Sequence, residues 1–170
     1  MDGDDPWCVV TRAYEYRHIV LFQETNLVGN VYFANHVAWQ GACREHFLRD
    51  HAPEIATQLL NGLSLVTVSC QCEYLAELVA FDEVVIRMTL VDSVQNRIDL
   101  GFDYLRVRGR DEELIAIGRQ RIACMQRQGE RLTPVPIPDA LRAALAPYGS
   151  ATGSVTRSTT ASTSDPGDAR

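Results

Sequence analysis

Three polar side chains share one face of an expected helix whose neighbouring positions are mostly apolar. The segment NLVGNVYFANHVAWQGACRE, residues 26–45, holds His36, Gln40 and Arg44 at intervals of four residues. Because an α-helix turns once in about 3.6 residues, these side chains form a stripe with apolar residues on both sides. A buried arginine needs an anion or several acceptors, which a ligand carbonyl, thioester or phosphate would supply. The ordinary alternative is an arginine that reaches solvent or pairs with a structural acid.

The loop before this helix adds groups that would hold another part of a ligand. Gly29 stands just before the expected first turn, and Asn30 is a suitable N-cap. The backbone N–H groups of residues 31–33 would then be free. Helix N-termini stabilise anions, including the oxyanion that forms during acyl transfer. We therefore interpret Asn26, Gly29, the helix start and Arg44 together as a candidate site for acyl transfer.

The rest of the chain shows which elements must position these residues. Helical spacing predicts a long helix over residues 31–50 and a shorter one over residues 53–60. Alternating β-branched and polar residues predict strands at residues 12–22, 63–77, 82–92, 97–108 and 114–127, with a turn at residues 109–111. One strand, a long helix and then a run of strands is an α+β pattern. In that pattern the helix lies on one face of an antiparallel sheet.

Composition limits both the number of domains and the kinds of ligand. A chain of 170 residues allows one domain with a substantial core, which we expect at residues 11–148. We expect residues 1–10 to be a leader and residues 149–170, which are rich in Ser and Thr, to be a disordered tail. The net charge of −6 argues against nucleic acid as the main ligand. All 16 cationic residues are arginines, which excludes lysine Schiff-base chemistry.

The cysteines and the apolar runs indicate the compartment. The spacing of the five cysteines is not that of a metal site, so we expect structural, reduced thiols and neither a metal nor a cofactor. No signal peptide is expected, because the first residues are acidic and lack an apolar core. No apolar run approaches the length of about 18 residues that a membrane-spanning helix needs. We therefore expect a cytoplasmic protein without membrane contact.

The same helical segment resembles a known family. NLVGNVYFANHVAWQGACREHFL is similar to the signature of hotdog-fold thioesterases of the 4-hydroxybenzoyl-CoA type. Its pattern from Asn30 to Glu45, which ends in Trp-Gln-Gly-x-Cys-Arg-Glu, best matches acyl-carrier-protein thioesterases that act with iterative enediyne polyketide synthases. The segment CEYLAELVAFDEVVIRM, residues 72–88, also resembles the central strands of those enzymes. The resemblance covers roughly residues 12–135.

This resemblance implies a fold, an assembly and a reaction. The fold would be a hotdog, with a long central helix wrapped by an antiparallel sheet. Subunits would pair into one continuous sheet with active sites at the dimer interface, and a homotetramer built as a dimer of dimers would be expected. The enzyme would hydrolyse a polyunsaturated β-keto acyl thioester from an acyl carrier domain, and the acid would decarboxylate to a methyl ketone polyene. Two alternatives stay open: an acyl-CoA thioesterase for an aromatic or medium-chain acid, and a non-catalytic acyl-binding module.

The resemblance also implies catalytic roles. The wider family has an aspartate where this chain has Asn26, and asparagine is neither a general base nor a carboxylate nucleophile. The enediyne group likewise lacks that acid. Asn26 would therefore orient the thioester or the attacking water. Arg44 and the backbone amides of Tyr32 and Phe33 would hold the oxyanion.

Further residues would contact the substrate or its carrier. The expected substrate-binding residues are Gly29, His36, Val37, Gly41, Leu65, Val66 and Thr67, with Leu48 as an additional lining residue. A neutral His36 would be able to accept a proton, and Glu24 would reach the site only if its loop doubles back. Thr67 would donate its hydroxyl to the partner subunit's site or be an ordinary strand threonine. Eight arginines in residues 97–131 form either a basic rim for the phosphopantetheine phosphate and an acidic carrier domain or a solvated strand face.

Overall fold

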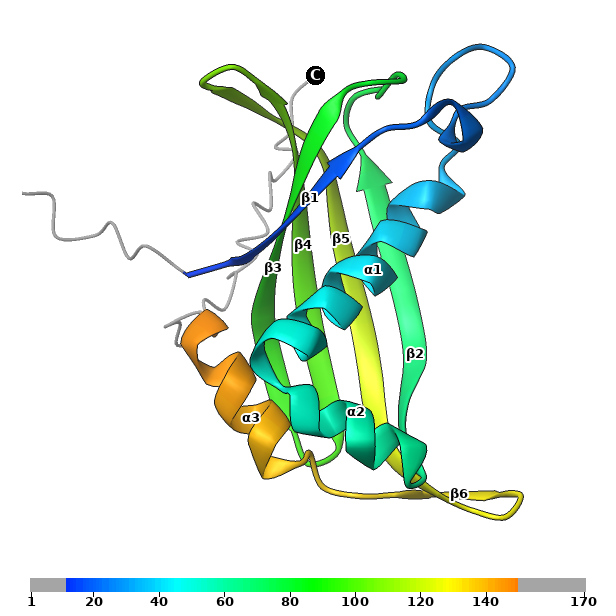
Figure 1. Ribbon diagram of the computed structural model, residues 1–170, viewed down its shortest axis with the longest axis vertical. Coiled ribbons are helices and arrows are strands. Elements are labelled where there is room, and N and C mark those ends of the chain that lie inside the picture. Colours follow the sequence, from blue (N-terminus) through cyan, green and yellow to red (C-terminus); the bar gives the residue numbers. More distant parts are fainter. Residues whose placement is uncertain (1–11, 150–170) are drawn as a thin grey trace, which may run out of the picture.

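The computed structural model describes residues 12–149, and within them a sheet curls around one long helix (Figure 1). The expected leader at residues 1–10 and almost all of the expected tail at residues 149–170 lie outside the described residues. The elements in chain order are β1 (Tyr14–Ile19), η1 (Phe22–Glu24), α1 (Ala34–His51), α2 (Pro53–Leu60), β2 (Leu63–Tyr74), β3 (Glu83–Val94), β4 (Arg97–Arg108), β5 (Asp111–Gln128), β6 (Arg131–Pro134), α3 (Asp139–Leu145) and η2 (Ala146–Tyr148). This arrangement confirms the α+β hotdog prediction.

The sheet has six antiparallel strands in the order β1-β3-β4-β5-β2, with the short β6 paired to the end of β5. The hairpin between β4 and β5 turns at Gly109-Arg110, where Gly109 has a φ of 65° that favours glycine. Strand β2 pairs with β5 on one side, and no described strand pairs with its other side. A strand of 12 residues therefore ends the sheet with one open edge.

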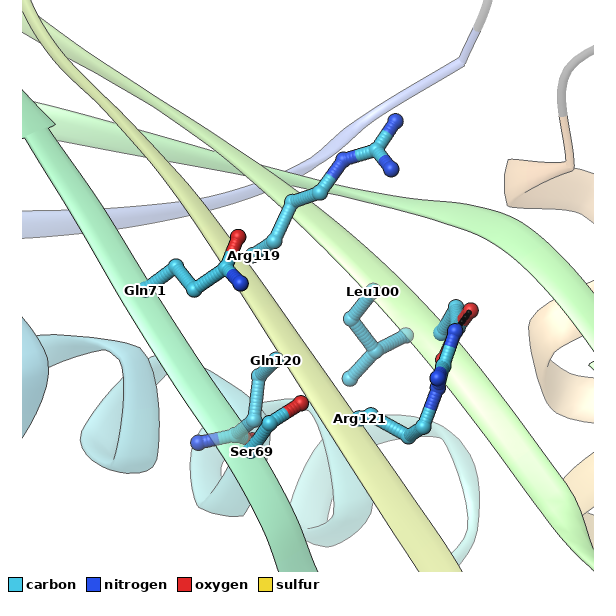
Figure 2. Close-up of a pocket in the computed structure, with 7 residues that line it drawn as sticks. Ser69, Gln71, Leu100, Arg119, Gln120 and Arg121 are labelled. Carbon is cyan, nitrogen blue, oxygen red and sulfur yellow. Dashed lines mark hydrogen bonds and ion pairs between the residues drawn. The ribbon is translucent and has the colours of Figure 1, made fainter.

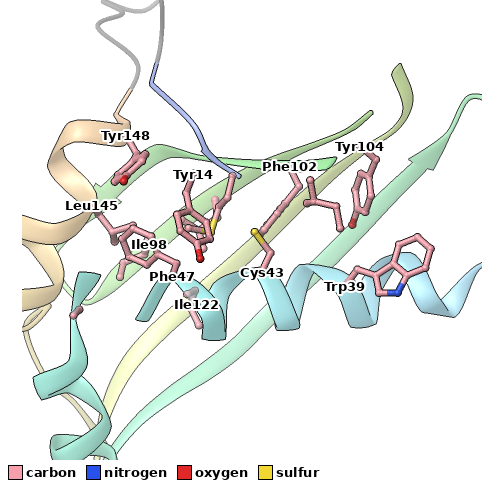
Figure 3. Packing of buried hydrophobic residues seen from close by; sticks show 14 of the residues in the cluster. Tyr14, Trp39, Cys43, Phe47, Ile98, Phe102, Tyr104, Ile122, Leu145 and Tyr148 are labelled. Atoms are coloured by element: carbon pink, nitrogen blue, oxygen red, sulfur yellow. The ribbon is translucent and has the colours of Figure 1, made fainter. Parts of the chain in front are cut away.

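Helix α1 lies in the core because its apolar residues recur every four positions. Trp39, Cys43 and Phe47 are each at most 4% exposed and pack against inward-facing side chains of the sheet, among them Phe102 and Tyr104 (Figure 3). Burying a side chain as large as that of Phe47 stabilises the fold by about 1.5–3 kcal/mol. The helix is therefore fixed in rotation, which decides where its polar residues point.

The start of this helix differs from the prediction. Residues 31–33 are not helical, and Phe33 is the N-cap, so the expected cap at Asn30 is wrong. Asn30 and Val31 instead form isolated antiparallel bridges, to Val79 and Thr25 respectively. The Val31 N–H donates to the Leu78 carbonyl at 2.8 Å. A backbone that is tied on both sides at Asn30 and Val31 cannot take helical dihedral angles there, so the helix begins only after these residues.

Four elements were not predicted from periodicity, namely η1, β6, α3 and η2. Helix α3 has seven residues and follows the proline-rich segment at residues 134–138. Its side chains Leu141 and Leu145 are buried against the sheet. No helix within residues 12–149 is long and apolar enough to cross a membrane.

Candidate active site

Asn26 closes a tight turn in the loop before α1. Its Oδ1 accepts a hydrogen bond from the Val28 N–H at 3.0 Å, and its Nδ2 donates to Oδ1 of Asn30. The Gly29 N–H donates to the Asn26 carbonyl at 3.0 Å, and Gly29 has a φ of 90°. An asparagine side chain that bonds to the backbone two residues later commonly forms such turns, and the positive φ favours glycine. The loop is exposed, so its conformation comes from these local contacts.

The backbone amides at the helix start differ in their freedom to donate. The Tyr32 N–H donates to the Glu24 carbonyl at 2.9 Å, so the prediction that this amide binds an oxyanion is wrong. The Phe33 N–H has no hydrogen-bond partner in the described part of the chain. Because Phe33 caps α1, its amide lies at the positive end of the helix dipole. Of the two amides expected to bind an oxyanion, only that of Phe33 is therefore free to donate among the described residues.

Arg44 lies inside the apolar side of α1. Its Nη1 donates to Oε1 of Gln120 at 3.0 Å and to Oγ1 of Thr67 at 3.3 Å. Its Nε is buried without a partner, and Arg44 forms no ion pair with a carboxylate among residues 12–149. Burial lowers the pKa of Arg44, but a guanidinium with an ordinary pKa above 12 keeps its charge. The site therefore contains a positive charge with free donor capacity and, among residues 12–149, no carboxylate at ion-pair distance.

The neighbours of this charge form a polar network, and sequence reasoning missed two of its members, Cys70 and Gln120. Gln40 is fully buried, donates from Nε2 to the Gln71 carbonyl at 2.9 Å, and accepts from the Cys70 thiol at 2.9 Å. A Cβ at Gly118 would collide with the Gln40 amide, so this glycine makes room for it. Gln120 is a polar residue at an inward-facing position of β5, between Gly118 and Ile122. This break in the apolar pattern was the sequence signal that could have identified Gln120 as a site residue. Thr67, for which both a role in the partner subunit's site and that of an ordinary strand threonine were open, contacts Arg44 of its own chain.

His36 lies in an aromatic cage at the beginning of α1. Its ring is 5.0 Å from the Trp39 ring, 5.0 Å from the Tyr74 ring and 5.6 Å from the Tyr104 ring, measured between centroids. The residue is 4% exposed, and neither ring nitrogen has a hydrogen-bond partner among the described residues. Burial lowers the pKa of His36, so the imidazole is neutral near pH 7. A neutral ring of this kind can donate or accept one proton toward a ligand.

Glu24 anchors the loop and is not a free base. Its carboxylate accepts hydrogen bonds from His18 Nε2 at 2.9 Å, from Trp39 Nε1 at 2.8 Å and from the Leu21 N–H at 2.8 Å. Burial raises the pKa of Glu24, but the hydrogen bonds from Leu21, His18 and Trp39 outweigh it and lower that pKa overall. The Glu24 carbonyl also accepts from Nδ2 of Asn35 at 2.6 Å. These contacts connect the loop, β1 and α1.

The apolar residues expected to line the acyl chain fall into two groups. Leu48 and Leu65 border a small cavity of about 10 Å³ that also touches Arg44. Val66 and Thr67 instead lie exposed on β2, the open edge strand, and Val37 is half-buried. Gly41 is half-buried too, and a Cβ built there would meet nothing within 4 Å. The space beside Gly41 and the β2 edge is therefore available to a ligand or to a second subunit.

The opposite face of the sheet carries a second depression, with a volume of about 150 Å³ (Figure 2). Its lining includes Arg119 and Arg121, and Arg121 forms an ion pair with Asp99 at 2.6 Å. Arg106 and Arg108 likewise pair with acids, both reaching Asp82. Three of the eight arginines that form either a basic rim or a solvated strand face are thus paired with neighbouring carboxylates. Within residues 12–149 no cluster of His, Cys, Asp and Glu has the arrangement of a metal site.

Fold and site together define a hotdog thioesterase. A family model described as the Thioesterase-like superfamily matches residues 20–145, and the chain belongs to this family. The protein is accordingly a thioester hydrolase. A comparison with curated protein sequences gives no significant match.

Among solved structures, the chain is similar to the dynemicin thioesterase, whose crystal structures describe induced-fit and allosteric effects upon polyene binding. The two share 52% sequence identity over 83% of this chain and 100% of that chain, with a TM-score of 0.80. A mutant 4-hydroxybenzoyl-CoA thioesterase bound to 4-hydroxybenzoyl-CoA is 18% identical over 79% of this chain and 99% of that chain, with a TM-score of 0.71. A 1,4-dihydroxy-2-naphthoyl-CoA thioesterase from Synechocystis is 16% identical over 79% of this chain and 96% of that chain, with a TM-score of 0.69. The last two similarities concern the fold alone.

Proposed function

We propose that the protein releases a polyunsaturated β-keto acid from the phosphopantetheine of an acyl carrier domain in an iterative, enediyne-type polyketide synthase. The freed acid then loses carbon dioxide and becomes a methyl ketone polyene. The similarity to the dynemicin thioesterase, at 52% identity, supports a polyene as the acyl chain. An apolar cavity that begins at Arg44 supports an acyl chain whose polar end lies beside the guanidinium.

The unpartnered Nε of Arg44 is the observation that carries this proposal. Hydrolysis begins when a water oxygen adds to the thioester carbonyl carbon and the carbonyl oxygen becomes an oxyanion. Arg44 and the Phe33 N–H both have free donor capacity for that oxygen. The carbon–sulfur bond then breaks, and the sulfur leaves with a proton that the water supplied.

No carboxylate in this mechanism takes the proton of the water. Asn26 orients the thioester or the water, because an amide neither gives nor takes a proton at neutral pH. Glu24 is engaged by three hydrogen-bond donors and keeps the loop in place. The rate then depends on how strongly the carbonyl is polarised and how well the water is positioned.

Assembly completes the proposed site. The open edge of β2 exposes Val66 and Val68, and an unprotected edge of this length would invite uncontrolled pairing. Two copies that pair through β2 would form one continuous sheet and cover this edge. Arg44 lies next to Thr67 on that strand, so each site would lie beside the partner subunit. A dimer of such dimers is the expected complete assembly.

The identity of the thiol carrier is testable with matched substrates. The same β-keto polyene acyl chain is presented once on the carrier domain and once on coenzyme A, and kcat/KM is measured for both. A higher kcat/KM with the carrier domain is expected. Faster hydrolysis of an aromatic or medium-chain acyl-CoA would instead make the protein an acyl-CoA thioesterase.

Mass spectrometry of the products monitors the second step, in which the β-keto acid loses carbon dioxide. The β-keto acid should appear before the methyl ketone. The same acid incubated in buffer without enzyme measures how much decarboxylation is spontaneous. Equal decay rates with and without enzyme would assign the protein the hydrolytic step alone.

A further inference from the structure

Two neighbouring cavities are both lined in part by residues of α3. The first has a volume of about 10 Å³ and is lined by Arg44, Phe47, Leu48, Leu65, Met88, Ile98, Leu100, Ile122, Leu141 and Leu145. The second has a volume of about 80 Å³ and is lined by Leu90, Ser93, Ile98, Ile137, Arg142, Leu145 and Ala146. Both cavities touch Ile98 and Leu145. These two side chains therefore form the wall between them.

The first cavity is apolar, and Arg44 borders it without presenting a polar atom to it. Arg44 is its one charged lining residue, and the others come from α1, four strands and α3. From Arg44 to Leu48 the cavity follows about one turn of α1, or roughly 6 Å. It then meets Leu141 and Leu145 of α3. A molecule with a polar head at Arg44 would point its tail at α3.

The wall between the two cavities is well packed. Leu145 is 3% exposed and Ile98 is fully buried, and Figure 3 shows both near Phe47 at the end of α1. Helix α3 is fixed beyond them by Tyr148, which shares a hydrogen bond of 3.1 Å with His51 Nε2. Gly149 also forms a bridge to Leu90 on β3. Helix α3 therefore holds the Leu145 side chain in a fixed position between the two cavities.

The second cavity, beyond Leu145, is larger than the first. A cavity of about 10 Å³ is at the lower limit for a single water molecule, so an acyl chain enters only by moving side chains. The second cavity is larger and is bordered by the exposed residues Arg142 and Ala146, so it reaches the surface. An acyl chain that extended past Leu145 would thus have space in the second cavity.

We infer that Leu145, supported by Ile98, is the residue that sets the acyl chain length this enzyme accepts. The inference rests on the proposed function, because it takes an acyl chain with its thioester at Arg44 as the ligand. Shortening Leu145 would join the two cavities and admit longer chains, whereas enlarging it would exclude chains that now fit. Leu145 and Ile98, which separate the two cavities, are both apolar, so the selection at this wall depends on shape.

Binding without hydrolysis provides the first test. A fluorescent conjugated polyenoic acid is displaced by a homologous series of straight-chain fatty acids, each two carbons longer than the last. In the parent protein the affinity should rise with length and then stop rising. In Leu145→Ala the rise should continue for at least one further member, with about a fourfold gain in affinity for each additional buried methylene. In Leu145→Phe the rise should stop at a shorter member.

Matched variants separate this effect from loss of stability. Leu63 on β2 is also a buried leucine, but it lines neither cavity, so Leu63→Ala should keep the parent's length limit. Leu145→Phe keeps the core filled and serves if Leu145→Ala does not fold. The same length limit in the parent and in a folded Leu145→Ala or Leu145→Phe protein would overturn the inference.

Hydrolysis of the corresponding acyl thioesters, compared by kcat/KM, provides the second test. A parallel shift of the length limit in binding and in kcat/KM supports both proposals. The protein could hydrolyse none of the thioesters while the length limit for binding still shifts in the Leu145 variants. That result would support Leu145 as the length-setting residue and reject the proposed function. Active hydrolysis with an unchanged length limit would reject the role of Leu145 alone.

Discussion

Arg44 on α1 donates a hydrogen bond of 3.0 Å to Gln120 on β5, an amide and not a carboxylate. The guanidinium is therefore held in position without being neutralised, while its Nε has no partner in the described structure. A neutral acceptor preserves the positive charge that a developing oxyanion needs. A carboxylate in place of Gln120 would have satisfied the arginine and weakened its attraction for substrate.

Removing this charge should stop turnover without unfolding the protein. Arg44→Ala is expected to lower kcat by about 10²–10³ with a carrier-bound β-keto acyl thioester. Arg44→Lys should rescue little of this loss, because an ammonium lacks the planar fork of donors. Arg49→Ala is the matched control, since Arg49 is exposed on the same helix. Parent-like turnover by folded Arg44→Ala would show that the arginine is structural.

Replacing Asn26 separates its role in the turn from its role in catalysis. Asn26→Asp keeps an oxygen that can accept from the Val28 N–H, whereas Asn26→Ala removes it. We expect a strong loss of turnover in Asn26→Ala and largely preserved turnover in Asn26→Asp, measured at equal protein concentration. Gly29→Ala perturbs the same turn through its φ of 90° and leaves the amide in place. If Gly29→Ala and Asn26→Ala lose activity equally, Asn26 acts through loop geometry.

Glu24 should stabilise the fold in a manner that depends on pH. Glu24→Gln weakens the contacts with His18 and Trp39 and should cost about 1–3 kcal/mol in the free energy of unfolding near pH 7. The folded-state pKa of Glu24 lies below its ordinary value of about 4.5. Its stabilisation is therefore complete above pH 4.5 and is lost as the pH falls through the lower folded-state pKa. Urea denaturation from pH 7 downward should show the two proteins converging in acid, and a constant difference would contradict this account.

His36 should make the protein less stable in mild acid. Its pKa is lowered by burial, so below about pH 6.5 the unfolded chain takes up a proton that the folded chain refuses. Stability is thus highest above pH 6.5 and falls as the pH drops toward the folded-state pKa. His36→Phe should remove this fall while filling the cage of Trp39, Tyr74 and Tyr104. Thermal melting between pH 7 and pH 5 tests the stability, and turnover of the same variant shows whether the imidazole also contacts the substrate.

The open edge of β2 should form the subunit interface. Val68→Glu places a charge on an exposed edge position, and in a symmetric pair the two carboxylates would repel each other. Sedimentation velocity at micromolar concentration should show an oligomer for the parent and a smaller species for the variant. Val94→Glu, an exposed valine on β3, should leave the assembly unchanged. A monomeric parent protein would reject the shared interface site.

The sequence by itself determined the α+β pattern, the long helix and the stripe of His36, Gln40 and Arg44. Helical periodicity repeats over short distances, so it is readable without the fold. The motif around Arg44 also indicated the family to which the chain belongs. The start of the helix was misplaced by about one turn, since the bridges of Asn30 and Val31 to distant residues carry no local signal.

Only the tertiary structure decided which of the polar groups remain available to a ligand. Whether the Tyr32 amide is free depends on Glu24, eight residues earlier, and whether Arg44 is neutralised depends on Gln120, 76 residues later. The tertiary structure also placed Leu145 of α3 at the end of the cavity that begins at Arg44. Hydrogen-bond satisfaction and cavity shape are properties of groups brought together from distant parts of the chain. Local sequence patterns therefore predict which residues are polar or apolar, but not which partners they find.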